Sequence, residues 1–190
     1  MYFRLVNNLH YSIMKILKRI FLGILALLLL GGLYFVYGLY INPKSPLGSA
    51  HYEKENQTID IRYYRPYKND RLIFGDKNEN ALVPFGLYWR LGANLTTKLT
   101  ATSDFTFAGR SLPAGSYGLY TYPYAENWVM VVHRNSGGFS AAEPDSEGIV
   151  MKVNVPVQTL DSPVEQFTID FVDHYLRMRW DTTQVVIPIE

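Results

Sequence analysis

The sequence predicts an all-β domain of the antiparallel sandwich or jelly-roll-like type, preceded by one N-terminal transmembrane α-helix. Between residues 57 and 190, apolar and polar residues alternate in short segments, and turn residues separate these segments about every 8–12 positions. No helical periodicity appears after residue 42, whereas Ile20 to Ile41 is an apolar run of 22 residues without a charge. A chain of 190 residues is long enough for one such domain with a sizeable core.

The apolar run predicts a membrane anchor. As a helix it would be about 33 Å long, which is enough for a hydrocarbon core of about 30 Å. Lys15, Lys18 and Arg19 precede it. The positive-inside rule therefore predicts a cytoplasmic segment at residues 1–19, the membrane helix at 20–41 and an extracytoplasmic remainder. In a Gram-negative cell this is a single-pass protein of the inner (cytoplasmic) membrane, with residues 42–190 in the periplasm. A cleaved signal peptide is the alternative, but its apolar region is normally shorter.

After the helix, the sequence predicts a linker and then a series of strands. Residues 42–56 contain two prolines and a glycine among polar residues, which is typical of a short linker. Residues 156–163 are expected to be a connection between strands. Apolar positions alternate along the segments 58–64, 95–102, 116–122, 127–133, 149–155, 167–171, 176–181 and 185–189.

Charge and cysteine usage exclude several classes of function. The net charge of +1 is the sum of two unlike regions. Residues 1–41 contain four bases and no acid, whereas residues 42–190 contain 14 bases and 17 acids and so carry −3. This balance does not indicate a nucleic-acid partner. The absence of cysteine excludes disulfides, thiolate zinc sites and a cysteine nucleophile.

The sequence contains no recognisable catalytic or metal-binding motif. Its four histidines, at positions 10, 51, 133 and 174, have no metal-ligand spacing. Gly115-Ser116-Tyr117-Gly118 does not fit the nucleophile elbow, and turn geometry explains its glycines better. We therefore expect no catalytic residue, no metal and no cofactor.

Six residues are candidates for ligand binding. An arginine offers a planar fork for a carboxylate or phosphate, and an asparagine both donates and accepts hydrogen bonds. The competing interpretation is structural: Arg90 would bind a carbonyl or a buried acid, Asn94 would form a turn, and His133 would lie on the surface. The candidates are Arg65, Trp89, Arg90, Asn94, Tyr117 and His133.

The chain is also rich in aromatic residues, with 15 tyrosines, 10 phenylalanines and 3 tryptophans. Exposed aromatic rings on a β-sandwich can stack on sugars, which indicates a glycan-binding module. We favour the alternative that the aromatic residues of the predicted strands form the core, namely Trp128, Phe167, Phe171 and Trp180.

Several segments resemble the bacterial family catalogued as domain of unknown function 2911. The similar segments are Leu82–Asn94 (LVPFGLYWRLGAN), Leu112–Thr121 (LPAGSYGLYT), Val164–Phe171 (VEQFTIDF) and Val185–Ile189 (VVIPI). The resemblance covers about residues 57–190 and implies an exported or membrane-attached β-rich protein of the kind abundant in Bacteroidota. Relatives usually have an acidic residue after Gly-Ala-Asn, where this chain has Leu95, so any role of that carboxylate is missing here.

The sequence thus predicts a membrane-anchored envelope protein whose β domain binds a small ligand, a glycan or a protein partner without catalysis. The alternative is a periplasmic hydrolase or isomerase that uses a polar pocket around Arg90, Asn94 and His133. A third hypothesis is a scaffold that assembles through its membrane helix.

Overall fold

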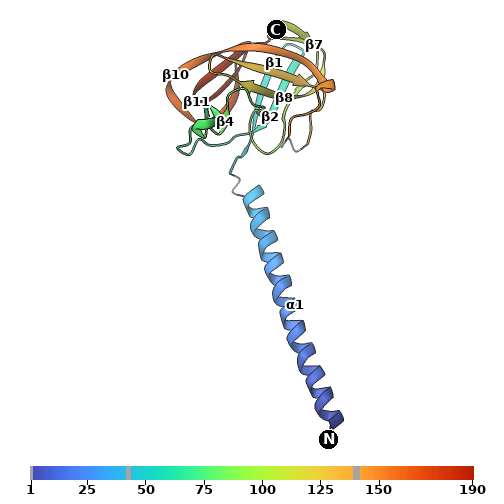
Figure 1. The fold of residues 1–190 in the computed structure, drawn as a ribbon. Helices are drawn as coiled ribbons and strands as arrows, with labels where there is room; N and C mark the ends of the chain where they lie inside the picture. Colours follow the sequence, from blue (N-terminus) through green and yellow to red (C-terminus); the bar gives the residue numbers. More distant parts are fainter. Residues whose placement is uncertain (1, 42–43, 139–141) are drawn as a thin grey trace. The chain divides into compact units, whose positions relative to one another are not determined.

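The chain consists of a long helix and a separate β domain. The computed structural model describes the backbone of residues 2–41, 44–138 and 142–190, and the side chains of residues 14–38, 41, 44–138 and 142–190. Asn42 and Pro43 of the predicted linker lie outside the described residues. The helix α1 spans Tyr2–Tyr40, and the chain divides into two compact units at Lys44 and Ser45. Figure 1 shows the helix and the β domain.

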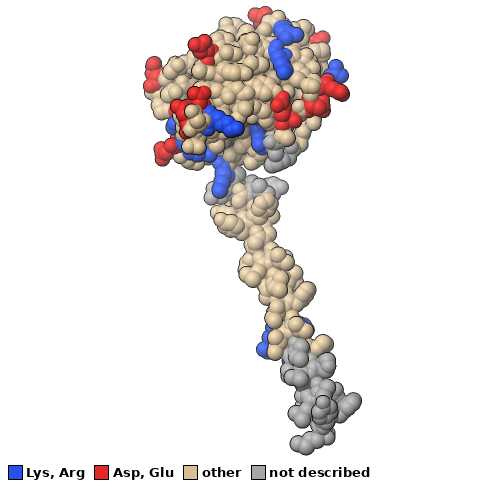
Figure 2. All heavy atoms as spheres, viewed as in Figure 1, with Lys and Arg blue, Asp and Glu red and all other residues tan. Residues whose placement is uncertain are grey.

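The helix α1 is a candidate membrane anchor. Its stretch Met14–Gly38 is long and apolar enough to cross a membrane, and the side chains there are exposed. Figure 2 shows basic residues on the helix next to the grey atoms at its N-terminal end, and the remaining helix surface in this view carries no charged residue. On the β domain, acidic and basic residues are interspersed. A signal sequence near an N-terminus shares these properties.

The β domain confirms the predicted all-β, antiparallel fold class. Its main sheet has seven strands in the order β1-β2-β5-β8-β9-β10-β11, and every neighbouring pair is antiparallel. These strands are β1 (Leu47–Lys54), β2 (Gln57–Tyr64), β5 (Thr97–Ala101), β8 (Gly115–Pro123), β9 (Asn127–His133), β10 (Ile149–Val172) and β11 (Tyr175–Pro188). Short pairs and turns complete the domain: β3 (Phe74–Gly75) with β4 (Val83–Pro84), β6 (Phe105–Phe107) with β7 (Arg110–Leu112), and the 3₁₀ helices η1 (Lys77–Glu79) and η2 (Ser146–Gly148).

The sheet curls until its two ends meet. The first half of β10 pairs with β9 and its second half with β11, so this strand bends across the domain (Figure 1). The hydroxyl of Tyr63, on β2, donates to the carbonyl of Ile169 on β10 and accepts from the Ile169 N–H, at 3.0 and 2.7 Å. Next to this contact, Phe167 N–H donates to the carbonyl of Pro66 at 2.9 Å. The two halves of one sheet therefore face each other, as the layers of a sandwich do.

Alternation along the strands fills the space between these halves. The inward positions of β2, β5 and β11 are almost fully buried, while their neighbours are exposed or half-buried. The prediction that Trp128, Phe167 and Trp180 belong to the core is confirmed, and Phe171 packs against that core. Each such ring removes a large apolar area from water, which is the dominant favourable term in folding.

The predicted linker at residues 42–56 is partly wrong, because it contains the strand β1. This strand pairs with β2 along its whole length, from Leu47 opposite Tyr64 to Lys54 opposite Gln57. Only Ala50 and Tyr52 of β1 are buried. A strand at the edge of a sheet with two inward residues has too little apolar alternation to be distinguished from a linker.

The predicted connection at residues 156–163 is also wrong. Those residues continue β10, with register shifts between Thr159 and Val164 and between Val164 and Thr168. Most of their side chains are exposed, and Pro156 and Pro163 lie within the strand. Because a bulged segment without buried residues lacks apolar alternation, its sequence is typical of a loop.

An ion-pair cluster stabilises the β10–β11 hairpin. The carboxylate of Asp170 accepts from Arg177 Nε and Nη2 at 2.8 and 2.9 Å and from Arg179 Nη2 at 2.7 Å. Burial by itself would raise the pKa of Asp170. The hydrogen bonds from Arg177 and the charge of Arg179 outweigh this effect and hold that pKa below its usual range. The ionised carboxylate is therefore the form that stabilises the fold.

We expect Asp170→Asn to destabilise the β domain by about 1–2 kcal/mol at neutral pH, a value reduced for partial exposure of the cluster. Because the folded-state pKa is lowered, this contribution is present above the unfolded pKa of about 3.9 and is lost as the pH falls through the folded pKa. The measurement is urea unfolding of the full chain in detergent, followed by tryptophan fluorescence at several pH values. Asp161→Asn, at an exposed position, is the control. A difference between wild type and Asp170→Asn that stays constant as the pH falls would contradict this account.

Candidate functional site

The stretch Leu82–Asn94 is positioned by backbone pairing with β8. Trp89 N–H donates to the carbonyl of Thr121 at 2.8 Å, and Thr121 N–H donates to the carbonyl of Trp89 at 2.9 Å. Gly86 N–H donates to the carbonyl of Pro123 at 2.7 Å. This segment is therefore fixed to the sheet before the chain turns into the loop at residues 90–94.

The turn after Trp89 requires a glycine. Leu91, Gly92 and Asn94 all have positive φ angles, of 57°, 136° and 57°. A Cβ at Gly92 would lie 2.7 Å from the carbonyl oxygen of Tyr64, so the close approach of the backbone to β2 excludes any side chain there. The buried carbonyl of Leu91 accepts from the Thr97 hydroxyl at 2.5 Å. The loop at residues 90–94 is thus held by its close approach to Tyr64 and by the hydrogen bond from Thr97.

Trp89 occupies the centre of an aromatic cluster. Its ring centroid lies 5.0–5.8 Å from those of four other rings, and its indole N–H donates to the carbonyl of Gly92 at 3.1 Å. With an exposed fraction of 7%, Trp89 cannot present a face for stacking on a glycan. The other members of this aromatic cluster are Phe74, Trp128, Phe167 and Trp180.

A cavity of about 310 Å³ lies against two of these tryptophans. Its volume is within the range of small-molecule sites, at the lower end. We call it the Trp89 pocket. Its lining residues are Ser45, Pro66, Arg71, Leu82, Val83, Trp89, Arg90, Gly92, Ala93, Asn94 and Trp180.

The charged residues that line the Trp89 pocket are both arginines. Arg71 Nε donates to the carbonyl of Lys68 at 2.9 Å, and its Nη2 donates to the carbonyl of Tyr67. Arg90 Nη1 donates to the carbonyl of Asn94 at 3.2 Å. These bonds to the backbone orient two guanidinium groups at the cavity, and no aspartate or glutamate is among its lining residues. The electrostatic character of this pocket favours an anion.

One residue that lines the pocket, Trp180, is almost fully buried. Trp180 is 1% exposed, and its indole N–H has no hydrogen-bond partner within the described part of the chain. An unsatisfied buried donor costs about 1–3 kcal/mol.

The structure brings together three of the six predicted site residues, Trp89, Arg90 and Asn94. The predicted hydrogen bond from Arg90 to a carbonyl is present, so the structural interpretation of Arg90 also holds. Arg65, in contrast, braces β2 against β10: its Nη2 donates to the Thr168 hydroxyl at 3.1 Å, and its side chain lies where a Cβ on Gly48 would be.

Tyr117 and His133 lie apart from the pocket lining. The Tyr117 hydroxyl donates to the carbonyl of Pro113 at 2.9 Å. The prediction of a surface position for His133 is wrong, since this residue is 2% exposed beneath Gly148, where a Cβ would lie 2.3 Å from the imidazole. Strand alternation failed here because β9 is buried on both faces near its end.

The hydrogen bonds of His133 leave neither ring nitrogen available for proton transfer. Asn135 N–H lies 3.0 Å from Nδ1, and the carbonyl of Asp145 lies 3.0 Å from Nε2. Because a backbone N–H only donates and a carbonyl only accepts, these contacts require the neutral tautomer with its proton on Nε2. This geometry gives no support to a hydrolase or isomerase that uses His133 as its base.

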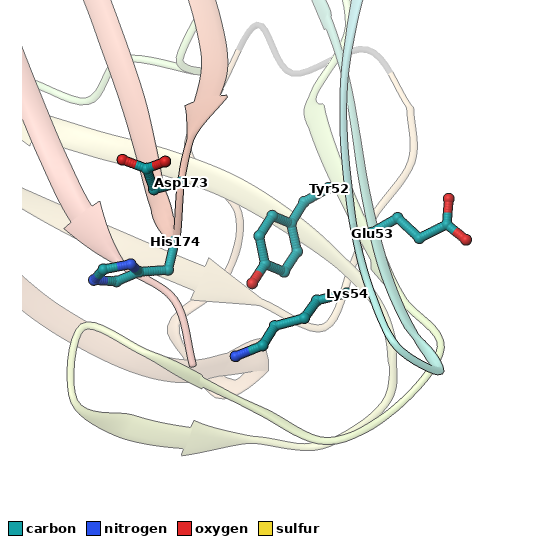
Figure 3. Close-up of a pocket in the computed structure, with 5 residues that line it drawn as sticks. All are labelled: Tyr52, Glu53, Lys54, Asp173 and His174. Carbon is teal, nitrogen blue, oxygen red and sulfur yellow. The ribbon is translucent and has the colours of Figure 1, made fainter.

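A second, shallower cavity lies between the β1–β2 and β10–β11 turns, lined by Tyr52, Glu53, Lys54, Asp173 and His174. Figure 3 shows that Glu53 points away from Tyr52 and that the imidazole of His174 also turns outward. These polar groups therefore do not converge on one point. No group of three or more potential metal-binding side chains is found among the described residues.

Sequence reasoning missed Arg71 and Trp180 as residues of the pocket. Arg71 belongs to the irregular segment that precedes the buried Ile73, and Trp180 alternates on β11 as an ordinary core residue. Backbone pairing of residues 72–75 with 82–85 brings Arg71 beside Leu82–Asn94, and the packing of β11 against Trp89 brings Trp180 there. A long-range contact of this kind leaves no local pattern in one sequence.

The fold and the helix define a β-rich domain tethered to an apolar N-terminal helix. A comparison with protein families extends this description: the chain belongs to the family described as protein of unknown function (DUF2911), whose model matches residues 45–189. The match begins at the first residue of the β domain, so β1 belongs to the family's domain. No curated protein and no solved structure matches the chain.

We expect Gly92→Ala to destabilise the β domain by about 1–3 kcal/mol, because the added Cβ meets the Tyr64 carbonyl and the φ angle disfavours alanine. Gly109→Ala is the matched control, since Gly109 also has a positive φ angle (74°) but has open space at its Cβ position. The measurement is urea unfolding of both variants. Equal losses of stability would show that the contact with Tyr64 has no effect.

Proposed function

We propose that this protein is a membrane-anchored envelope protein that binds a small anionic ligand in the Trp89 pocket without catalysis. The observation that carries the proposal is the composition of this pocket, in which Arg71 and Arg90 face a cavity with no lining carboxylate. Residues 42–190 carry a net charge of −3, whereas the only charged residues that line this pocket are two arginines. The pocket therefore differs in sign of charge from the domain as a whole.

The shape and polarity of the pocket support a ligand with two parts. The guanidinium groups fit a carboxylate or a phosphate, with which arginine forms paired hydrogen bonds. Trp89, Leu82 and Val83 offer an apolar wall for the rest of the molecule. The lining residues include no histidine, cysteine, lysine, aspartate or glutamate, so no lining base could activate the one hydroxyl among them, that of Ser45. Binding is therefore the function that this pocket supports best.

The test is a titration of the full chain in phosphatidylcholine nanodiscs with phenyl phosphate, followed by tryptophan fluorescence. All three tryptophans belong to the cluster at or beside the pocket, so binding there should change the signal. We expect saturable binding of phenyl phosphate and none of phenol. Arg71→Gln and Arg90→Gln should each weaken binding about 10–100-fold, the effect of one lost charge-assisted hydrogen bond.

Arg62→Gln is the matched control, because Arg62 is an exposed arginine on β2 outside the pocket. Its affinity should equal that of the wild type. Equal binding of phenol and phenyl phosphate, or equal affinities of all three variants, would contradict an anion site at this pocket.

We also propose that the helix is retained and that the β domain lies on the outer side of the inner membrane. The basic residues Lys15, Lys18 and Arg19 precede the apolar run, which favours this orientation, and the length of the run favours an uncleaved anchor.

The absence of cysteine makes this topology directly testable. A single cysteine at the exposed Ser111 should react with a membrane-impermeant maleimide in cells whose outer layer has been permeabilised. The labelled protein should keep the full mass of 21.8 kDa. Labelling only after lysis would contradict the orientation, and a mass reduced by at least that of the apolar helix would show a cleaved signal sequence.

A further inference from the structure

Arg71 is oriented by the turn that carries it. Its Nε donates to the carbonyl of Lys68 at 2.9 Å, and its Nη2 donates to the carbonyl of Tyr67. Both acceptors belong to the backbone just before Arg71, so the position of the guanidinium depends on that of the backbone. Whatever holds this turn in place therefore also holds Arg71 at the Trp89 pocket.

The turn at residues 68–71 is tight and is anchored to β10. Asn69 and Asp70 have positive φ angles of 47° and 55°, and Arg71 N–H donates to the carbonyl of Lys68 at 3.1 Å. Asparagine and aspartate are suited to such a turn. Lys68 N–H donates to the carbonyl of Glu165 at 2.7 Å, and Asn69 N–H donates to the Glu165 carboxylate at 2.9 Å. One side of the turn is thus fixed to the sheet.

An ion pair fastens the same turn to β11. The ammonium of Lys68 donates to Asp181 Oδ2 at 2.7 Å and to the carbonyl of Arg71 at 3.3 Å. The side chains of Lys68 and Asp181 are only 24% and 17% exposed, so solvent screens their attraction less than that of a surface pair. Lys68 thus links the carboxylate of Asp181 to the backbone of the residue that binds the anion.

Asp181 lies where β11 reaches the pocket. It directly follows Trp180, which lines the pocket. Its φ angle is 52°, and its partner on β10 is Val164, which lies between two register shifts of the hairpin. Bulges of this kind re-aim side chains. At this bulge, the carboxylate of Asp181 meets the ammonium of Lys68.

We infer that Asp181 is a positioning residue for the anion site: through Lys68, its carboxylate holds the turn at residues 68–71 and keeps Arg71 at the Trp89 pocket. This inference rests on the proposed anion site. It gives the carboxylate an effect opposite to that of its charge. A negative charge close to an anion site weakens anion binding when it acts through space, whereas the same charge strengthens binding when it holds the arginine in place.

The test is the phenyl phosphate titration of the full chain in phosphatidylcholine nanodiscs, applied to Asp181→Asn. Asparagine is of the same size and tolerates a φ angle of 52°, so the change removes the charge without straining the backbone. We expect binding about tenfold weaker than that of the wild type, within the range of couplings in one hydrogen-bond network.

Asp173→Asn is the matched control. Asp173 is an exposed aspartate of the β10–β11 turn, also with a φ angle of 52°, and it lies outside the lining of the Trp89 pocket. Its substitution removes the same charge and leaves the ion pair of Lys68 intact. Its affinity for phenyl phosphate should equal that of the wild type.

Combination with the two arginine variants separates positioning from a general effect on the fold. Arg90 donates to the carbonyl of Asn94, in a different loop from Arg71. We expect Asp181→Asn to change the affinity by less than about twofold in the Arg71→Gln background and by the full factor of about ten in the Arg90→Gln background. A loss of fold stability alone would weaken binding equally in both backgrounds.

Three results would overturn the inference. Tighter binding by Asp181→Asn would show that the carboxylate acts only through its charge. Equal weakening in both arginine backgrounds would assign its effect to the fold as a whole, and unchanged binding would show that the turn holds Arg71 without it. In each case the anion site stands if Arg71→Gln still weakens binding. A wild type that does not bind phenyl phosphate would refute the inference and the proposed function together.

Discussion

The packing around Trp89 is the interaction on which the rest of the β domain depends. Its ring meets four aromatic side chains that come from β3, β9, β10 and β11, and its backbone is paired with β8. Aromatic pairs contribute about 0.5–1.5 kcal/mol each beyond the area they bury. One residue thus ties a loop and five strands into a single core, and the curled sheet closes around it.

The candidate site is a consequence of the same packing. The indole N–H of Trp89 donates to the carbonyl of Gly92 and so fixes the turn that places Arg90 and Asn94 at the rim of the cavity. The sheet contributes Trp180, and the segment after β2 contributes Arg71. Because the loop is braced by the core, its polar groups are preorganised, which lowers the entropic cost of holding a ligand.

The sequence contained enough information for the fold class and for much of the core, because alternation with a period of two is a local signal. The sequence did not predict the segments in which buried and exposed residues do not alternate. β1 has two buried residues and resembles a linker, the bulged middle of β10 resembles a loop, and His133 is buried on the face expected to meet solvent. For the candidate site, Trp89, Arg90 and Asn94 were predictable because they stand close together in the sequence. Arg71 and Trp180 were not, because only tertiary contacts bring them there.

The central claim is that the loop at residues 90–94 and the adjoining Arg71 form an anion site on the Trp89 core. Hydrogen–deuterium exchange of the full chain in phosphatidylcholine nanodiscs, with and without glycerol 3-phosphate, measures this most directly. We predict slower exchange of backbone amides at residues 71–72 and 90–96 when the anion is present, with unchanged exchange around His133. Protection centred on His133, or no protection anywhere in the β domain, would contradict the account.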